Sequence, residues 1–173
     1  MPAAVRNRWW LPFVVHGSIV ATAVSLGLAS WFIAKPLKTR LHETVPGQRL
    51  TVAATPEIDI SLDTDSSVAV SNTEPPRIEL LKGNAFFSVN GEKPDKLQVK
   101  VGTTYIRDTG TRFSVRKWPK GGSVAVASGQ VEILVETGTY LVGAHERADF
   151  DGARVMNHRV VGDTEIAPWH IGR

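Results

Sequence analysis

The stretch SVAVASGQVEILV, residues 123–135, decides the fold class, because apolar side chains alternate in it with small or polar ones on either side of a Ser-Gly pair. The alternating apolar positions are Val124, Val126, Val131, Ile133 and Val135. Alternation with a period of two indicates a strand that buries one face, and a Ser-Gly pair indicates a turn. These residues therefore predict two half-buried strands joined at Ser128-Gly129.

The same alternation recurs through most of the preceding sequence, from residue 58 onward. The other runs are Ile58/Ile60/Leu62, Val68/Val70, Ile78/Leu80, Leu97/Val99/Val101 and Phe113/Val115. Turn signals separate the runs, and Asn90-Gly91 is the best candidate for a tight hairpin. No stretch after Ala34 has the apolar period of an amphipathic helix. The sequence therefore predicts an all-β domain, closed either as a stacked, solenoid-like arrangement or as a twisted sandwich, which share this pattern.

Glycine and aromatic residues refine this prediction. The glycines at 83, 102, 110, 129 and 143 suit positions that need a positive φ or a close approach between backbones. Three phenylalanines, Phe86, Phe87 and Phe113, are expected to fill the interior beside them. Arg112 is either an anion-binding residue at a turn or a solvent-facing strand residue, and its alternation with Phe113 favours the second interpretation.

The composition is that of a globular protein, with 42% hydrophobic and 21% charged residues in 173. The absence of cysteine excludes disulfide scaffolds, thiolate metal sites and cysteine nucleophiles. The net charge of +3 comes from the N-terminal part, because residues 1–43 carry five basic side chains against Glu43. The remaining residues are nearly balanced, so no basic surface for nucleic acid is expected.

No pattern of an enzyme or of a metal site is present in the sequence. It contains no Gly-x-Ser-x-Gly elbow, His-Glu-x-x-His pair, phosphate-binding loop or dinucleotide fingerprint. His145, His158 and His170 lack metal-ligand spacing, and the acidic pairs near residues 63 and 149 lack the full ligand set of a calcium loop. We therefore expect no catalytic residue, cofactor or metal.

The N-terminal segment Trp9–Ala34 has 26 residues without a formal charge. As a helix it would span roughly 39 Å, enough to cross a hydrocarbon core of about 30 Å with some tilt. The expected organisation is a cytoplasmic tail (1–8), a transmembrane helix (9–34), a spacer (35–48) and a periplasmic β-domain (49–173), anchored once in the inner membrane. The alternative is a signal peptide cleaved after Ala29.

Small residues recur at a period of four within this segment, at Gly17, Ala21, Ser25 and Ala29. Such a stripe allows close approach of a second helix in a membrane. We therefore name it as a candidate packing surface for another transmembrane helix. The alternative is that these residues reflect only the usual abundance of Gly, Ala and Ser in membrane helices.

Several short motifs in a fixed order resemble the FecR-type periplasmic sensor domain over roughly residues 44–172. They are Gly83-Asn84-Ala85-Phe86-Phe87-Ser88-Val89, Gly110-Thr111-Arg112-Phe113-Ser114-Val115, the strand-Gly-strand step around Gly129, Leu141-Val142-Gly143 followed by Ala144, and the closing Trp169-His170-Ile171-Gly172. The matching positions are Gly83, Ala85, Phe86, Val89, Gly110, Thr111, Phe113, Val115, Gly129, Gly143, Trp169 and Gly172. Their residue types indicate structural roles.

This resemblance implies a membrane-anchored regulator in cell-surface signalling. In such regulators the periplasmic domain receives a signal from an outer-membrane TonB-dependent receptor, often for iron-siderophores, and a cytoplasmic domain controls an extracytoplasmic-function sigma factor. Only eight residues precede Trp9, and the chain stops after Trp169-His170-Ile171-Gly172-Arg173. We therefore expect a sensor that lacks the usual sigma-binding and receptor-contacting domains. The alternative is a periplasmic or secreted FecR-domain binding module with no role in sigma regulation.

Overall fold

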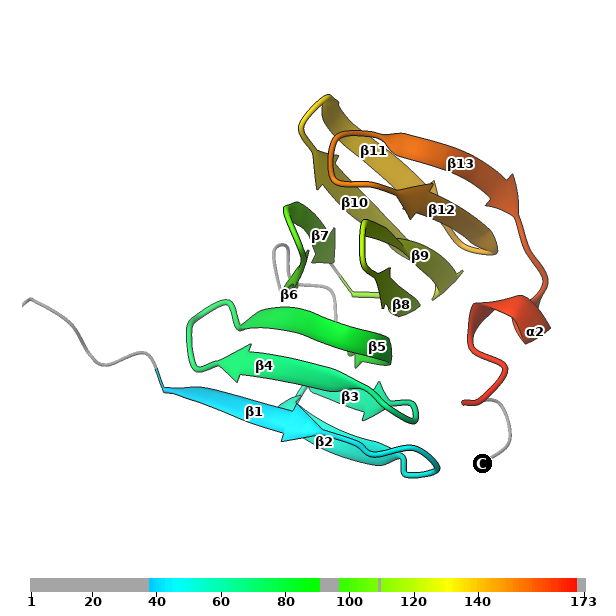
Figure 1. Ribbon diagram of the computed structural model, residues 1–173. Helices are drawn as coiled ribbons and strands as arrows, with labels where there is room; N and C mark the ends of the chain where they lie inside the picture. The colour runs from blue at the N-terminus through cyan, green and yellow to red at the C-terminus, as the bar shows by residue number, and fades with distance from the viewer. Residues whose placement is uncertain (1–37, 91–96, 109, 171–173) are drawn as a thin grey trace, which may run out of the picture. The chain divides into compact units, whose positions relative to one another are not determined.

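The computed structural model describes residues 38–90, 97–108 and 110–170, and it confirms the all-β prediction for them (Figure 1). These residues form thirteen strands and one helix of four residues. The predicted transmembrane segment, with Gly17, Ala21, Ser25 and Ala29, lies outside the described residues. Among the described residues, no helix is both long enough and apolar enough to span a membrane.

The elements follow one another with short connections. They are β1 (Thr39–Glu43), β2 (Leu50–Thr55), β3 (Ile58–Leu62), β4 (Ser67–Ser71), β5 (Arg77–Val89), β6 (Leu97–Val101), β7 (Thr104–Asp108), β8 (Arg112–Trp118), β9 (Gly121–Ser128), β10 (Gln130–Val135), β11 (Gly138–Gly143), β12 (Glu146–Phe150), β13 (Val155–Val160) and α2 (Asp163–Ile166). Every run of alternating residues that the sequence analysis names lies in one of these strands.

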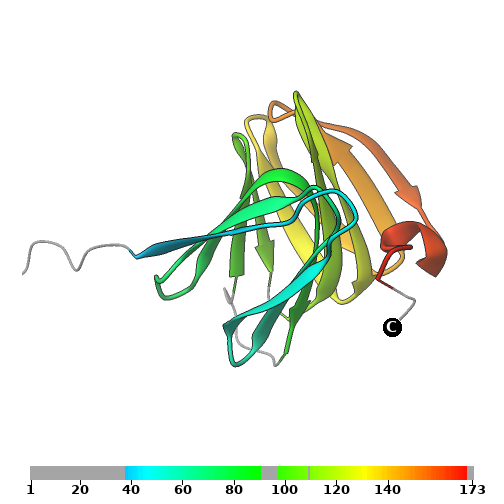
Figure 2. The same ribbon diagram turned by 60° about the horizontal axis from the view of Figure 1, so that its bottom comes forward.

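Two sheets share the long strand β5. Sheet A has the order β1-β4-β5-β6-β7-β10-β11, and sheet B has the order β2-β3-β5-β8-β9-β12-β13. From β6 onward, successive hairpins belong alternately to sheet A and sheet B, and the strands of each sheet follow one another in chain order (Figures 1 and 2). The two sheets enclose one core between them.

Strand β5 changes sheets halfway along its length. Its first half pairs with β4 in sheet A, and its second half pairs with β3 and β8 in sheet B. The chain then returns to sheet A, where β6 pairs in parallel with the beginning of β5. The hairpin predicted at Asn90-Gly91 is therefore wrong, although Gly91 itself lies outside the described residues. A strand that ends in the opposite sheet cannot turn tightly into its neighbour.

The main core lies between the two sheets and draws on both. Its largest fully buried side chains include Phe87, Phe113 and Phe150, together with Ile and Leu residues of β3, β5, β7 and β10. The rings of Phe87 and Phe113 stack with centroids 5.0 Å apart. Phe86 corrects the expectation that all three phenylalanines fill this interior, because it lies in a second cluster. Neighbouring residues of a strand point to opposite faces, so Phe86 and Phe87 cannot share one core.

Strand β1 lies within residues 35–48, which the sequence analysis predicts as a spacer. Its five residues pair antiparallel with β4, from Thr39 opposite Ser71 to Glu43 opposite Ser67. Four of these five residues are exposed, so they provide no hydrophobic alternation from which a strand could be predicted. The pairing of their backbone with β4 places them in sheet A.

Candidate functional site

The motif glycines lie where the chain passes from one sheet to the other. Gly83 lies at the change of sheets within β5, Gly110 between β7 and β8, Gly129 between β9 and β10, and Gly143 at the end of β11 before β12. The first three have positive φ values of 78°, 128° and 86°, whereas Gly143 does not have a positive φ. These motif positions therefore set the connections of the fold.

The remaining motif residues are buried in the cores or in the connections. Ala85, Val89, Phe113 and Val115 belong to the main core. The hydroxyl of Thr111 donates to the buried Asp108 carboxylate, which also accepts the Gly110 N–H over 3.2 Å. Gly172 lies outside the described residues. Apart from Phe86 and Trp169, which belong to a second cluster, the described residues that carry the resemblance thus form a scaffold.

The last described residues, 161–170, fold back over the outer face of sheet B, and we call them the C-terminal strap. Val161, Ile166 and Ala167 of the strap are buried against Phe86 and Ala125, which point outward from β5 and β9. The strap contains α2, and Pro168 follows the helix closely, as is common where a helix ends. A second, smaller core thus lies outside sheet B.

Aromatic side chains at the end of the strap extend this outer core. The His170 ring stacks on Phe86 with a centroid distance of 4.2 Å, and Trp169 contacts His170 edge to face at 5.8 Å. The guanidinium of Arg49 lies 5.9 Å from the centre of the Trp169 ring. Trp169 is half-buried, so the closing Trp of the motif seals the strap onto sheet B and does not enter the main core.

The Val161 N–H donates to the His145 carbonyl over 2.8 Å, and side-chain contacts hold the strap at three further positions. The Ser114 hydroxyl on β8 donates to the carbonyl of Ile166. His145, in the turn before β12, lies with its Nδ1 3.0 Å from Oδ1 of Asp163. Arg159 pairs with Glu165 over 2.9 Å. The two ion pairs are solvent-exposed and therefore weak, so the apolar contacts to Phe86 and Ala125 provide most of the binding of the strap.

Replacing Ser114 with alanine is expected to loosen the strap selectively. The change removes one hydrogen bond to the Ile166 carbonyl, which is worth about 0.5 to 1.5 kcal/mol. Hydrogen exchange should become faster at the strap amides of Val161 and His170, whereas the strands should stay protected. The matched control is Ser71→Ala, which removes a serine hydroxyl contact in sheet A. Equal exchange of the strap in both variants would contradict the assigned role of Ser114.

The turn that presents His145 is itself stabilised by a carboxylate. Glu146 Oε2 accepts the Gly143 N–H over 2.7 Å and lies 3.0 Å from Nε2 of His158. The Gly143 hydrogen bond, with a smaller contribution from His158, holds the pKa of Glu146 below its ordinary value. A carboxyl group whose pKa is lowered by folding stabilises the fold above its unfolded pKa and loses this contribution as the pH falls through the folded pKa.

Glu146→Gln is therefore expected to destabilise the protein near neutral pH and to have less effect in acid. The Glu146 side chain is 35% exposed, so the expected loss near pH 7 is only a few tenths to about 1 kcal/mol. Denaturant unfolding of wild type and variant over about pH 3 to 7 should show the two stabilities converging as the pH falls. Glu136→Gln, at an exposed glutamate before β11, is the control. A difference that stays constant with pH would rule out the charge of Glu146 as its cause.

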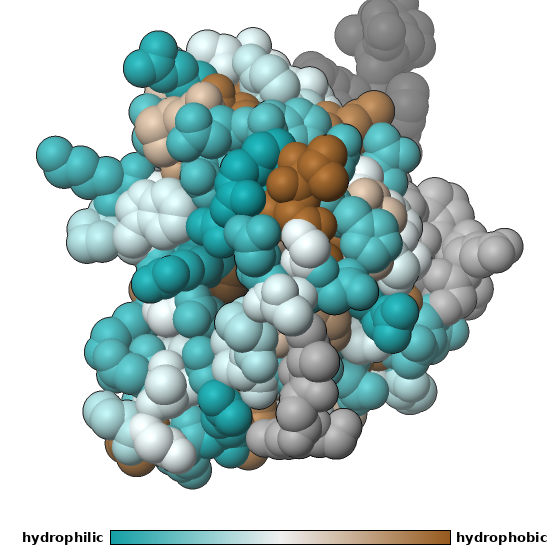
Figure 3. All heavy atoms as spheres, turned by 90° about the vertical axis from the view of Figure 1, so that its right-hand side faces the viewer, coloured by the Kyte–Doolittle hydropathy of each residue, from teal (hydrophilic) through white to brown (hydrophobic). Residues whose placement is uncertain are grey.

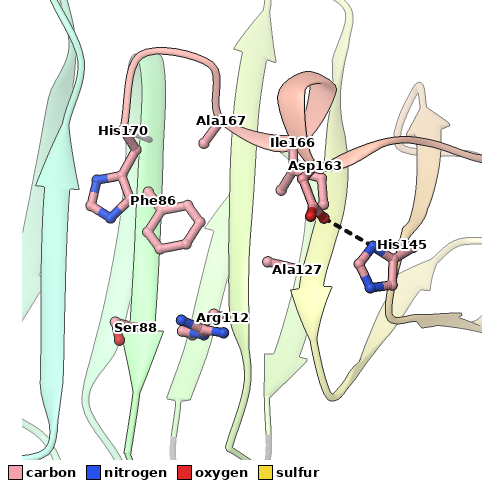
Figure 4. A pocket seen from close by; sticks show the side chains of 9 residues that line it. All are labelled: Phe86, Ser88, Arg112, Ala127, His145, Asp163, Ile166, Ala167 and His170. Carbon is pink, nitrogen blue, oxygen red and sulfur yellow. Dashed lines mark ion pairs between the residues drawn. The ribbon is translucent and has the colours of Figure 1, made fainter. Parts of the chain in front are cut away.

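An open pocket of about 500 Å³ lies between the strap and sheet B (Figure 4). Figure 4 shows the strap along one side of the pocket and Arg112 and Ser88 on the side away from it, with the His145–Asp163 pair at one end. The lining residues are Phe86, Ser88, Arg112, Ala127, His145, Asp163, Ile166, Ala167 and His170. Its size falls in the range of pockets that bind small molecules.

Arg112 gives this pocket its charge. Its Nε donates to the Ser128 hydroxyl over 3.1 Å, and no carboxylate among the described residues pairs with its guanidinium. The single carboxylate of the lining, Asp163, lies beside His145. Ser88 of β5 lies directly opposite Arg112 of β8 in sheet B, so a hydroxyl and a guanidinium lie next to each other in the lining. The pocket can therefore accept an anion.

The histidines lie in separate places. His145 contacts Asp163, His158 contacts Glu146, and His170 stacks on Phe86. Within the described part of the chain, no three His, Cys, Asp or Glu side chains are grouped closely enough to hold a metal ion.

Sequence reasoning missed this pocket because its residues come from distant parts of the chain. The solvent-facing interpretation of Arg112 is compatible with its place on the outer face of sheet B, but alternation carries no information on what lies above that face. The one available signal was the pair Phe86-Phe87, because two adjacent bulky residues on a strand require an apolar cover on both faces.

Comparison with known proteins gives the family. A sequence model of the family described as FecR protein matches residues 40–132, more than half of the chain. No match was found among curated proteins. Two crystal structures, at 2.50 and 1.65 Å resolution, of a protein described as a "putative anti-sigma factor" from Parabacteroides distasonis have the same fold, with TM-scores of 0.67 and 0.66.

The likeness to these two structures concerns the fold, because the sequence identity is 17% in both cases. It covers 78% and 77% of this chain and 66% and 65% of the other chains, so the present chain spans slightly less than two thirds of their length. The sequence match runs from β1 into β10 and includes Phe86, Ser88 and Arg112, while the strap lies beyond it. On the strength of this match, the chain belongs to the FecR protein family.

Proposed function

We propose that this protein is a regulator of the FecR type, in which the described β-domain receives a signal and passes it toward a sigma factor. The observation that supports the proposal most directly is the family match over residues 40–132. The fold that the domain shares with proteins described as anti-sigma factors agrees with it. In this proposal the scaffold residues hold the two sheets, and the surface of sheet B under the strap is the part that responds to a signal.

The proposal includes an anchor in the inner membrane. The apolar run of residues 9–34 serves as the transmembrane helix, and the β-domain lies in the periplasm. The stripe of Gly17, Ala21, Ser25 and Ala29 contacts a partner helix, which transmits the signal across the membrane. On the outer side, a TonB-dependent receptor is the proposed source of the signal, with iron-siderophore uptake as its candidate stimulus.

Transcription tests the regulatory role. A strain without the gene and the same strain complemented with it should differ at a group of promoters that share one alternative sigma recognition sequence. The measurement is a transcriptome comparison, repeated with and without an iron chelator. Identical transcriptomes would contradict regulation and would favour the alternative, a FecR-domain binding module without a role in sigma control.

Fractionation tests the anchor separately. The intact mass of the native protein and its protease sensitivity in spheroplasts should show an unprocessed chain in the inner membrane, with a domain that external protease digests. A chain cut near Ala29 and recovered in the soluble periplasmic fraction would contradict the anchor. That result would also remove the route through a partner helix.

A further inference from the structure

We infer that the pocket between the C-terminal strap and sheet B binds a small organic carboxylate that carries an aromatic or similarly flat apolar group. This inference rests on the proposed function, because it names the class of ligand that would carry the signal to the β-domain. The ligand site itself follows from the charge, shape and position of the pocket residues (Figure 4).

The guanidinium of Arg112 is the group of the pocket that would bind an anion, whereas Asp163, the carboxylate of the lining, lies beside His145. Arg112 is held in place by the hydrogen bond from its Nε to Ser128, which leaves the Nη groups with no bond to the described residues. Ser88 lies directly opposite Arg112 in the pairing of β5 with β8, so its hydroxyl can donate to the same anion. A planar carboxylate matches the fork of guanidinium donors, and such charge-assisted hydrogen bonds are the stronger kind.

The apolar walls select an organic anion over a bare inorganic one. His170 stacks on the buried Phe86 at 4.2 Å, and both rings line the pocket together with Ile166, Ala167 and Ala127. A flat apolar group that lies against these side chains loses its contact with water, which favours binding. The pocket volume of about 500 Å³ leaves room for both parts of such a ligand.

The position of the pocket links the ligand to the strap. Phe86, Ser88 and Arg112 come from sheet B, whereas Asp163, Ile166, Ala167 and His170 come from the strap. A ligand that touches both parts favours the closed position of the strap, because it gains contacts that the open position does not offer. Figure 3 shows the face of the molecule on the right-hand side of Figure 1, where hydrophilic residues predominate and patches of hydrophobic residues lie among them.

A second arginine on the same strand supplies a matched control. Arg116 lies four residues along β8 on the same outer face, and it lines a separate pocket on the other side of the strap. Like Arg112, it pairs with no carboxylate among the described residues. The two positions therefore share residue type, strand and face, and they differ in the pocket that they line.

Benzoate is the probe, with benzamide as its uncharged isostere. The full-length chain, labelled with 5-fluorotryptophan, is titrated with each compound at millimolar concentrations while the fluorine signal of Trp169, the neighbour of His170, is followed. We expect a saturable shift with benzoate and a much weaker response to benzamide. Arg112→Gln should weaken benzoate binding by about 10- to 100-fold, whereas Arg116→Gln should bind like wild type. Thermal unfolding of both variants checks that they fold.

Three results would each overturn the inference: no saturable shift with benzoate, equal binding of benzamide, or equal losses in Arg112→Gln and Arg116→Gln. The transcriptome comparison keeps this test distinct from that of the proposed function. If the protein binds benzoate through Arg112 but its gene affects no promoter, the ligand site stands and the proposed regulatory role is contradicted. If the gene affects promoters but the protein does not bind benzoate, the regulatory role stands and the proposed ligand class is contradicted.

Discussion

Replacing Phe113 with alanine is expected to lower the free energy of unfolding by about 3 to 5 kcal/mol. Phe113 has no exposed surface and stacks on the equally buried Phe87 with ring centroids 5.0 Å apart. Its strand, β8, pairs with neighbours on both sides, so the backbone cannot move inward to close the cavity. The loss therefore combines the transfer of the ring with an unfilled void.

Denaturant unfolding at equilibrium measures this loss, and Phe86→Ala is the control. Phe86 carries the same ring, but it belongs to the outer cluster and is covered by His170 and the strap. Because the strap can settle onto the space left by the ring, we expect a smaller loss of about 1.5 to 3 kcal/mol. Equal losses for the two variants would show that the outer cluster is as rigid as the main core and would contradict this account.

Gly83→Ala is expected to cost about 2 to 5 kcal/mol, the second large effect. Gly83 has a φ of +78°, which disfavours a side chain. A Cβ atom there would lie 2.6 Å from the Asp65 carbonyl oxygen and 2.8 Å from the Ser66 Cα. These are backbone atoms of the β3–β4 connection, which is itself tied to β5 by the hydrogen bond from the Asn84 N–H to the Ser66 hydroxyl. The neighbours therefore cannot move aside cheaply.

Gly47→Ala separates the two causes of this loss. Gly47 has a similar φ of +85°, but a Cβ atom there would meet nothing within 4 Å. Its substitution should therefore cost only the backbone strain, about 1 to 2 kcal/mol. The difference between the two variants, measured by denaturant unfolding, gives the cost of the steric contact. A loss for Gly47→Ala as large as that for Gly83→Ala would show that close packing at the change of sheets contributes nothing.

Both predictions concern residues of the family motifs, and both effects are structural. Most of the motif residues fill the main core or set the connections between sheets, whereas Phe86 and Trp169 belong to the outer cluster. The pocket, by contrast, combines Arg112 and Phe86 with residues of the strap beyond the matched range. Exposed side chains and the strap can therefore vary while the scaffold stays intact.

The alternating runs were enough to predict the strands that supply most of the main core, because the period of two is a local property of the backbone. The named runs leave out β2, β7, β11 and β12, and the argument offers no signal at β1 and β13, whose residues are almost all exposed. It also failed at Asn90-Gly91, where a favourable turn sequence follows a strand whose end belongs to the other sheet. The end of β5 and the following strand β6 belong to different sheets, and no local sequence pattern specifies which strands pair.

The sequence by itself determined the all-β class, the inward-facing residues of most strands, and the glycines that mark the connections, because each depends on a few neighbouring residues. Only the tertiary structure decided that Phe86 faces a second core and that Arg112, Ser88 and His170 line one pocket. The physical reason is that these contacts join segments far apart in the sequence, since Ser88 and Arg112 are 24 residues apart and Arg112 and His170 are 58 apart. They form only when β5 changes sheets and the strap folds back over sheet B.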